Sequence, residues 1–329
     1  MRDTFVKVLI DYARKNENLM LLTGDLGAGA LEPFEKEFPE RFINCGIAEQ
    51  NMIAVATGLA LSGKQVVVYS IGNFNTLRVL EFIRNLVCYN NANIKIVSIG
   101  AGLEYGPLGF THHATEDIAC MRAMPNMSVF SPATKGECEF CVNEMLTSNT
   151  PCYLRLAKKE ITSPIEWIYL KDQKTYSVSF NFKPKAFNKI FTGQKVAIVA
   201  TGRSLEEAIG AGAKLTAHQY QGEAVSPAVF SMPQLKPVNE SLIAKHLSKF
   251  DYVYTIEEHS VIGGLGSIIC EIVAKFNLNV QVIPIGIRDE IKPVVGDEEY
   301  LIHQNGYDIS GNTIILDVLK RVVGKNSQK

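Results

Sequence analysis

Apolar residues in the first half of the chain fall in short, nearly continuous runs, separated by longer segments with apolar residues at helical spacing. The short runs are rich in β-branched residues, which is typical of strands buried on both faces of a parallel sheet. The longer segments have the period of helices. Predicted strands occupy 19–25, 66–70, 94–100, 127–133 and 152–157, and predicted helices occupy 49–62, 75–89, 115–123 and 135–148.

This pattern weakens between residues 161 and 194, where prolines mix with polar residues, and then resumes. We therefore predict a first domain at 1–160, a linker at 161–194 and a second, smaller domain at 195–329. Right-handed crossovers between parallel strands make both domains α/β, each a doubly wound α/β/α layer structure. In the second domain, predicted strands occupy 195–202, 224–230, 252–258 and 280–286, with helices starting at 205 and 264.

Composition narrows the class of protein. The 329 residues are 47% hydrophobic and 20% charged, with a net charge of −1, which is typical of a globular protein with a large core. No block of like charge is present, so neither nucleic acid nor an anionic membrane is expected as a partner. The first residues lack the apolar core of a signal peptide, and no apolar run is long enough to span a membrane. We expect a cytoplasmic location.

Seven cysteines are scattered through the chain, which fits reduced thiols better than a disulfide framework. Cys138 and Cys141 have CxxC spacing inside a predicted helix. Neither a second cysteine pair nor a nearby histidine completes a set of four zinc ligands. We predict two ordinary helix residues here.

Glu49 stands where a short apolar strand gives way to the apolar helix 49–62, in the stretch "INCGIAEQNMIAVATGLAL". As a first-turn acid it would be stabilised by the helix dipole. In an apolar pocket, the same carboxylate would bind protons more tightly and suit acid–base chemistry. The pattern does not choose between these two interpretations.

Two glycine-rich segments follow predicted strands, where α/β sheets bind ligands. In "GDLGAG" (24–29), Asp25 is either a local cap or a ligand contact. The long loop "GLEYGPLGFTHHATED" (102–117) contains His112 and His113, which are candidates for ligand contacts or for a helix cap. Because adjacent residues point in different directions, at most one of the two histidines is expected to face a given site.

A third glycine-rich segment, "IEEHSVIGGLGSII" (256–269), precedes a helix in the second domain. A phosphate could bind at the start of that helix. The glycines could instead serve close packing at a domain or subunit contact, which glycine permits because it has no side chain.

Four motifs occur in one order after a strand: "GIAEQNM" with its apolar helix, "NFNTLRVLEFIRN", "THHATEDIACMRAMPNMSVFSPA" and "EEHSVIGGLGS". Together they resemble the pyrimidine-binding and carboxy-terminal domains of thiamine-diphosphate enzymes of the transketolase type, over nearly the whole chain. Similar halves occur in deoxyxylulose-phosphate synthase and in the β subunits of 2-oxoacid dehydrogenases. The carboxy-terminal subunit of a split transketolase is the nearest match.

The resemblance implies roles for individual residues. Glu49 would hydrogen-bond the ring nitrogen of the cofactor's aminopyrimidine and share a proton with it. Phe74 would stack on that ring, and Asp25 would lie near the cofactor. His112 would face the reacting carbon and the substrate hydroxyls. Arg78 and Glu81 resemble split-transketolase positions, and an ion pair at a subunit contact would explain them equally well.

One departure from the family concerns the diphosphate. The family binds it with Mg²⁺ in a separate domain, through GDG followed by Asn, and neither "GDL" at 24 nor "GDE" at 296 has that context. The resemblance therefore implies a partner, an amino-terminal transketolase subunit that carries the Mg²⁺ ligands. This chain is expected to hold no metal. The expected assembly is a heterotetramer in which two copies of this chain pair with each other and with two partners.

A second departure lies in the substrate pocket. Leu108, Gly100 and Gly29 stand where the family has an acid, a phosphate-binding histidine and a serine, while Lys158 replaces an arginine. A missing hydrogen-bond partner changes specificity strongly. One cationic contact, Lys158, remains for substrate binding, and an unphosphorylated or nucleotide-linked sugar becomes a candidate substrate.

The predicted function is thus that of one subunit of a transferase, a transketolase that moves a two-carbon ketol unit between a ketose and an aldehyde sugar. Two alternatives stay open. One is a 2-oxoacid dehydrogenase E1 β subunit or an enzyme like deoxyxylulose-phosphate synthase. The other is a non-catalytic scaffold that kept the fold and lost the cofactor.

Overall fold

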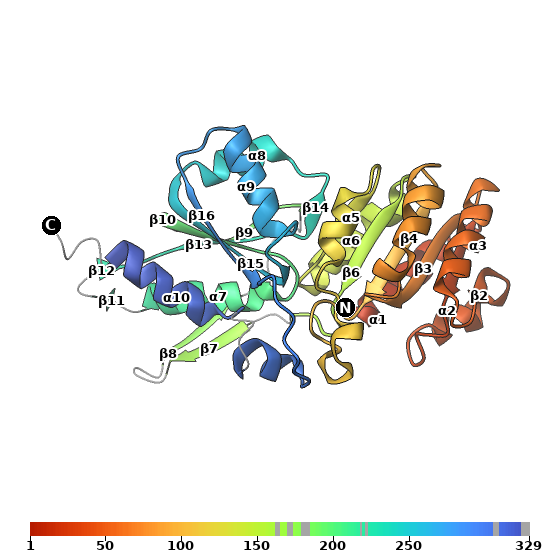
Figure 1. Cartoon of the computed structure of the whole chain (residues 1–329), viewed down its shortest axis with the longest axis horizontal. Coiled ribbons are helices and arrows are strands. Elements are labelled where there is room, and N and C mark those ends of the chain that lie inside the picture. Colours follow the sequence, from red (N-terminus) through yellow and green to blue (C-terminus); the bar gives the residue numbers. More distant parts are fainter. Residues whose placement is uncertain are drawn as a thin grey trace.

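The computed structural model describes residues 1–161, 165–169, 174–178, 185–217, 219–220, 223–304 and 309–323. Two sheets lie side by side in this part of the chain, each with helices on both faces (Figure 1). This confirms the predicted α/β class and the doubly wound layers. In the same residues, no helix is long and apolar enough to cross a membrane.

The first sheet contains seven strands in the order β14-β5-β6-β4-β3-β1-β2. Six of them come from the first half of the chain and are parallel. The seventh, β14 (Gln234–Lys236), comes from the second half and pairs antiparallel with β5. The parallel strands are β1 (Leu19–Thr23), β2 (Phe42–Asn44), β3 (Gln65–Ile71), β4 (Ile94–Ile99), β5 (Ser128–Phe130) and β6 (Cys152–Leu156).

Both faces of this sheet are covered, which explains the continuous apolar runs of its strands. In β3, Val66 and Val68 pack in the same core as residues of α3 (Glu49–Leu61). The alternate residue Val67 packs on the opposite face, in the core that contains residues of α1 (Arg2–Ala13) and α6 (Lys135–Thr147).

Some predicted helices are confirmed in detail and others are irregular. Helix α6 begins after Thr134, the N-cap residue, whose hydroxyl accepts the Glu137 N–H at 3.2 Å. Helix α5 (Asp117–Ala123) begins two residues later than predicted. The segment predicted as one helix over 75–89 has three parts in succession: a 3₁₀ turn, one α turn and a π-helical stretch. These parts are Leu77–Val79, α4 (Leu80–Phe82) and Ile83–Cys88.

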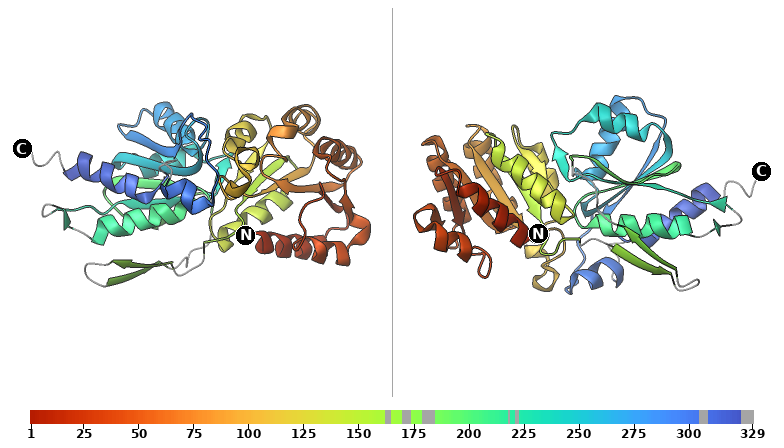
Figure 2. Two further views of the ribbon diagram at one scale, coloured as in Figure 1. Left: turned by 60° about the horizontal axis from the view of Figure 1, so that its bottom comes forward. Right: turned by 180° about the vertical axis from the view of Figure 1, so that it is seen from behind.

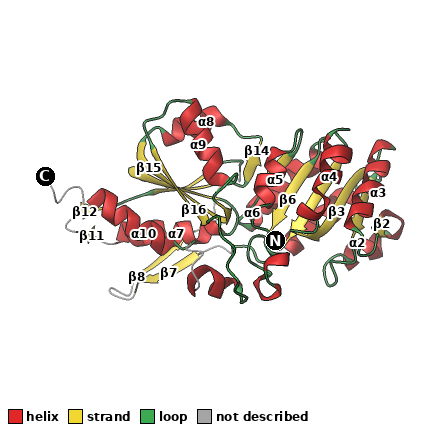
Figure 3. Cartoon of the chain, in the orientation of Figure 1, coloured by secondary structure: helices red, strands yellow, loops and turns green. Residues whose placement is uncertain are grey.

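The second sheet has five strands in the order β16-β15-β10-β13-β9, of which only β9 is antiparallel to its neighbour. Helices α7 (Ser204–Ala217) and α10 (Gly311–Val318) cover one face, and α8 (Glu240–Leu247) and α9 (Leu265–Lys275) cover the other (Figure 3). Its strands are β9 (Asn188–Phe191), β10 (Lys195–Ala200), β13 (Ala228–Ser231), β15 (Phe250–Ser260) and β16 (Gln281–Ile287).

The stretch predicted as a linker, 161–194, contains secondary structure. Strands β7 (Ile165–Tyr169) and β8 (Lys174–Val178) form an antiparallel hairpin outside the two sheets, next to α7 (Figure 2). Strand β9 belongs to the second sheet, where its edge position explains its mixed polar pattern. Residues 162–164, 170–173 and 179–184 of this stretch lie outside the described residues. The predicted domain limits stay a prediction.

Candidate active site

Glu49 lies at the carboxyl edge of the first sheet, as the first residue of α3 after β2. Its side chain is 3% exposed, and its Oε2 is 3.1 Å from Nη1 of Arg78, whose side chain is 47% exposed. A Cβ on Gly24, in the turn after β1, would lie 3.5 Å from Cγ of Glu49. The carboxylate is therefore buried at the edge of the sheet and paired with a cation. An acid that only stabilises the helix dipole needs neither burial nor a cationic partner.

Phe74 lies in the turn that follows β3 and is linked to Glu49 through Arg78. The guanidinium carbon of Arg78 is 4.3 Å from the centroid of the Phe74 ring. The imidazole of His112, from the loop after β4, packs at an angle of 61° to this ring, with 5.2 Å between centroids. The structure thus brings together, in one row of contacts, Glu49, Phe74 and His112, which the sequence places in three separate motifs.

The two adjacent histidines face different surroundings, as predicted. His112 is half-buried, with Nδ1 3.0 Å from the Thr111 hydroxyl, and it points toward Phe74. His113 is 3% exposed and packs against Phe110 on the other side of the loop. Burial lowers the pKa of the His113 imidazole and so favours its neutral form.

Lys158, which follows β6, extends this row at its far end. Its ammonium lies 3.4 Å from the centroid of the Tyr105 ring and donates to the Glu104 carbonyl oxygen at 3.0 Å. The Tyr105 centroid is 6.4 Å from that of His112. Partial burial lowers the pKa of Lys158.

A cavity of about 250 Å³ opens beside Lys158. A second cation, Arg2, lines this cavity, and the sequence analysis did not predict it. A helix that precedes a parallel strand runs antiparallel to it, so the first residues of α1 lie at the carboxyl edge, and this could have signalled Arg2. The lining residues are Arg2, Leu26, Gly27, Ala28, Tyr69, Ile71, Ile99, Tyr105 and Lys158.

Gly100 explains how this cavity differs from the expected family pattern. A Cβ at this position would lie 2.0 Å from Cε2 of Tyr105, so the glycine lets the tyrosine ring occupy the space beside it. Tyr105 thus stands where a side chain at position 100 would project. Leu108 is 55% exposed on the same loop, and Gly29 is exposed in the turn after β1.

The loop that carries His112 is tied at its base to the second domain. Gly102 and Ala114 exchange backbone hydrogen bonds of 3.1 and 2.9 Å, which close the loop. A carboxylate oxygen of Glu258, on β15, accepts the Leu103 N–H at 2.5 Å, and the Ser260 N–H donates to the Thr115 carbonyl at 2.8 Å. Burial raises the pKa of Glu258 to about 8.

A buried ion pair supports the same loop from the sheet. Nε of Arg155, on β6, donates to Oδ2 of Asp117 at 2.8 Å, and both side chains are at most 3% exposed. The Tyr153 hydroxyl donates to the same oxygen at 2.5 Å. Nη2 of Arg155 donates to the carbonyl oxygens of Ala114 and Glu258, at 2.8 and 2.9 Å. The pair therefore joins β6, the loop and the second domain.

Asp25 lies at the same sheet edge, but its described contacts differ from those of the row. It is exposed, with a φ of +58°, and its Oδ1 accepts from Nδ2 of Asn44 at 3.1 Å. The Asn44 Oδ1 accepts the Asp25 N–H at 3.0 Å in return. Asp25 is one residue from Gly24, which borders Glu49, and its role toward a cofactor stays a prediction.

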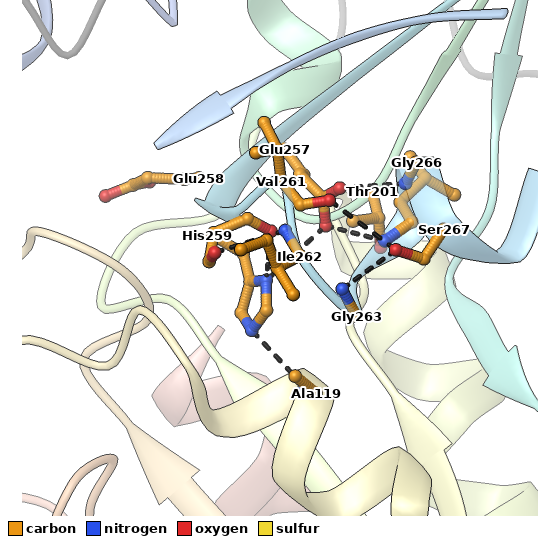
Figure 4. Close-up of polar contacts among 12 residues, drawn as sticks. Ala119, Thr201, Glu257, Glu258, His259, Val261, Ile262, Gly263, Gly266 and Ser267 are labelled. Atoms are coloured by element: carbon orange, nitrogen blue, oxygen red, sulfur yellow. Dashed lines mark hydrogen bonds and ion pairs between the residues drawn. The ribbon is translucent and has the colours of Figure 1, made fainter. Parts of the chain in front are cut away.

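The glycine-rich segment of the second domain serves close packing at the domain contact (Figure 4). A Cβ on Gly263 would lie 2.6 Å from that of Ala119, on α5. Two N–H groups at the start of α9, those of Leu265 and Gly266, donate to the Glu257 carboxylate at 2.6 and 2.8 Å. The Glu257 carboxylate thus occupies the start of α9, the position at which a phosphate could otherwise bind.

Cys138 and Cys141 are buried residues of α6, as predicted. Across the described ranges, no group of three or more His, Cys, Asp or Glu side chains is placed to hold a metal ion.

Comparison with known proteins assigns both halves of the chain. Residues 1–164 match the model of the transketolase pyrimidine-binding domain, and residues 187–305 match that of the transketolase C-terminal domain. A chain of Methanocaldococcus jannaschii named after the C-terminal section of transketolase is 36% identical over 323 residues, which cover 98% of this chain and 96% of that relative.

Two further matches are similarly complete. One of the subunits of an apulose-4-phosphate transketolase from Actinobacillus succinogenes is 30% identical over 309 residues, 94% of each chain. A solved structure described as a split gene transketolase, an inactive β4 tetramer, is 30% identical and superposes with a TM-score of 0.81, covering 98% of this chain and 97% of that one.

The chain therefore belongs to the transketolase family of thiamine-diphosphate enzymes. It has the domain content of the carboxy-terminal subunit of a transketolase-like transferase that is split over two chains, and the split relatives imply an amino-terminal partner subunit.

Proposed function

We propose that this chain, with its amino-terminal partner, transfers a two-carbon ketol unit from a ketose to an aldehyde sugar. The observation that carries the proposal is the continuous row of Glu49, Arg78, Phe74 and His112 along the carboxyl edge of the first sheet. A buried carboxylate, an aromatic face and an imidazole are the groups that the family resemblance assigns to a thiamine site in this domain.

The residues fit the pyrimidine end of thiamine diphosphate. A planar, N–H-bearing group, the Arg78 guanidinium, already lies against the Phe74 ring and the Glu49 carboxylate. An aminopyrimidine is also planar and has a ring nitrogen that can share a proton with a carboxylate. When bound, the cofactor would supply a carbon nucleophile for the substrate carbonyl. Glu49 would hold the shared proton, Phe74 would orient the ring, and His112 would move protons at the substrate hydroxyls.

The partner subunit supplies the diphosphate site and the Mg²⁺ ligands in this proposal, and two copies of each chain form a heterotetramer. The test is to co-express this chain with a chain that carries GDG and the following Asn. We expect the complex to bind thiamine diphosphate with Mg²⁺ and to transfer a ketol unit. A complex that binds no cofactor would favour the scaffold alternative, and CO₂ release from pyruvate would favour the dehydrogenase or synthase alternative.

His112→Ala separates turnover from cofactor binding. His112 contacts Phe74 and is separated from Glu49 by Phe74 and Arg78. We expect kcat to fall about 10²–10³-fold, the scale of a lost proton-transfer group. The dissociation constant of thiamine diphosphate should stay within about threefold, since Glu49 keeps its contacts and Phe74 loses one edge contact. Steady-state kinetics and calorimetric titration of the two-chain complex measure the two effects. Equal weakening of both would contradict the assigned position.

The cavity between Arg2 and Lys158 is proposed to bind an anionic end of the sugar, such as a phosphate. Replacing either cation by methionine should raise KM for a phosphorylated donor about 10–100-fold, as expected for a lost charge-assisted hydrogen bond. KM for the unphosphorylated sugar should stay nearly unchanged. Lys159→Met is the matched control, because Lys159 lines a different cavity. Equal effects on both sugars would mean that the cavity binds no anion.

A further inference from the structure

Arg78 makes contacts that a thiamine cofactor would also have to make. Its Nη1 lies 3.1 Å from Oε2 of Glu49, and its guanidinium carbon lies 4.3 Å from the centroid of the Phe74 ring. Glu49 is 3% exposed, while the Arg78 side chain is 47% exposed. One half-exposed side chain thus covers both the buried carboxylate and the aromatic face of the pyrimidine site.

The guanidinium and the aminopyrimidine make equivalent demands on this site. Each is planar and stacks on an aromatic ring, and each brings nitrogen-bound hydrogen to a carboxylate. Two planar groups cannot occupy one face of Phe74 together. A cofactor ring that stacks on the Arg78 side of Phe74 and hydrogen-bonds Glu49 therefore requires the guanidinium to leave.

We propose that Arg78 is a placeholder: it holds the pyrimidine site closed until the cofactor displaces it. This inference rests on the proposed function. Glu49 is partnered by Arg78 while the site is closed and by the cofactor ring once it is loaded, so the buried carboxylate is never left unpaired. The exposed part of Arg78 gives the guanidinium a path into water when it leaves.

A placeholder lowers the apparent affinity for the ligand, because only the fraction of molecules with an open site can bind it. Arg78→Met removes the charge and the planar group but keeps an unbranched side chain. In the reconstituted two-chain complex, we expect Arg78→Met to bind thiamine diphosphate about tenfold more tightly and to associate with it faster. Arg78→Lys, which can pair with Glu49 but has no planar group, should fall between Arg78→Met and the parent.

The matched control is Arg84→Met, on the same helical stretch, where the exposed Arg84 donates to Asn85. Calorimetric titration gives the affinity and stopped-flow fluorescence gives the association rate, both without any need for turnover. For Arg84→Met we expect neither quantity to change. Unchanged or weaker binding by Arg78→Met overturns the placeholder, since Arg78 would then be inert or part of the loaded site. Absence of binding by the parent complex overturns the proposed function itself, and the placeholder with it.

Discussion

Replacing Glu49 by glutamine is expected to lower ketol transfer by the assembled enzyme at least about 10³-fold, near the upper end of what one acid–base group contributes. Glutamine has nearly the same shape, and its amide can still accept a hydrogen bond. It cannot share a proton with the cofactor ring. The loss should therefore appear in kcat, measured at saturating thiamine diphosphate, with the circular dichroism spectrum unchanged.

Two control variants separate this chemistry from the dipole interpretation of Glu49. Glu49→Asp keeps a negative charge at the start of α3 but withdraws the carboxylate, so it should also lose most activity. Glu240→Gln neutralises another first-turn acid, that of α8, and should leave activity unchanged. An active Glu49→Gln complex would reduce Glu49 to a helix-start acid.

Arg155→Met is expected to cost roughly 3–5 kcal/mol of folding free energy, the range found when one partner of a buried ion pair is removed. Among the described contacts of the buried Asp117 carboxylate, the hydrogen bond from the Tyr153 hydroxyl would remain. The carbonyl oxygens of Ala114 and Glu258 would each lose a donor. Urea unfolding of this chain measures the loss as a lower midpoint with little change in slope.

The control for this prediction is Arg14→Met, which breaks an exposed pair with Glu37 and should change the midpoint little. If the urea midpoint of Arg155→Met were no lower than that of this control, the buried pair would not stabilise the contact between the domains. Because the pair holds the base of the loop that contains His112, we also expect kcat to fall in the variant that remains folded.

Much of the architecture is readable from the apolar pattern, and the reason is burial on both faces. Strands β3 and β4 bury every residue, so their continuous apolar runs are unambiguous. Strand β14 has three residues and pairs with β5 from a position about 100 residues later in the chain, so no local pattern could reveal it. Strand β9 lies at a sheet edge, where polar residues are tolerated, and it was hidden inside the predicted linker.

The site was predictable only as separate parts. The resemblance named Glu49, Phe74 and His112 one by one, and the structure places them in a single row. The partner of Arg78 could not be foreseen. Glu81, a candidate for an ion pair at a subunit contact, accepts instead from Asn85 within its own helical stretch, while Arg78 reaches Glu49, 29 residues away in the sequence. Arg2, in contrast, reaches the Lys158 cavity because α1 returns to the carboxyl edge, which the order of helix and strand could have signalled.

Strand β14 comes from the second half of the chain but completes the sheet of the first domain. Separating the two domains therefore removes a strand from that sheet. A fragment that ended near residue 161 would leave β5 as an open edge, with backbone groups that now bond to residues 234 and 236. It would also expose the apolar surface against which Leu235 packs, since the Leu235 side chain is now only 1% exposed. Such an edge recruits strands from other molecules. Anyone who shortens this chain to a minimal pyrimidine-binding unit should therefore expect self-association, and should carry residues 233–237 along on a short tether.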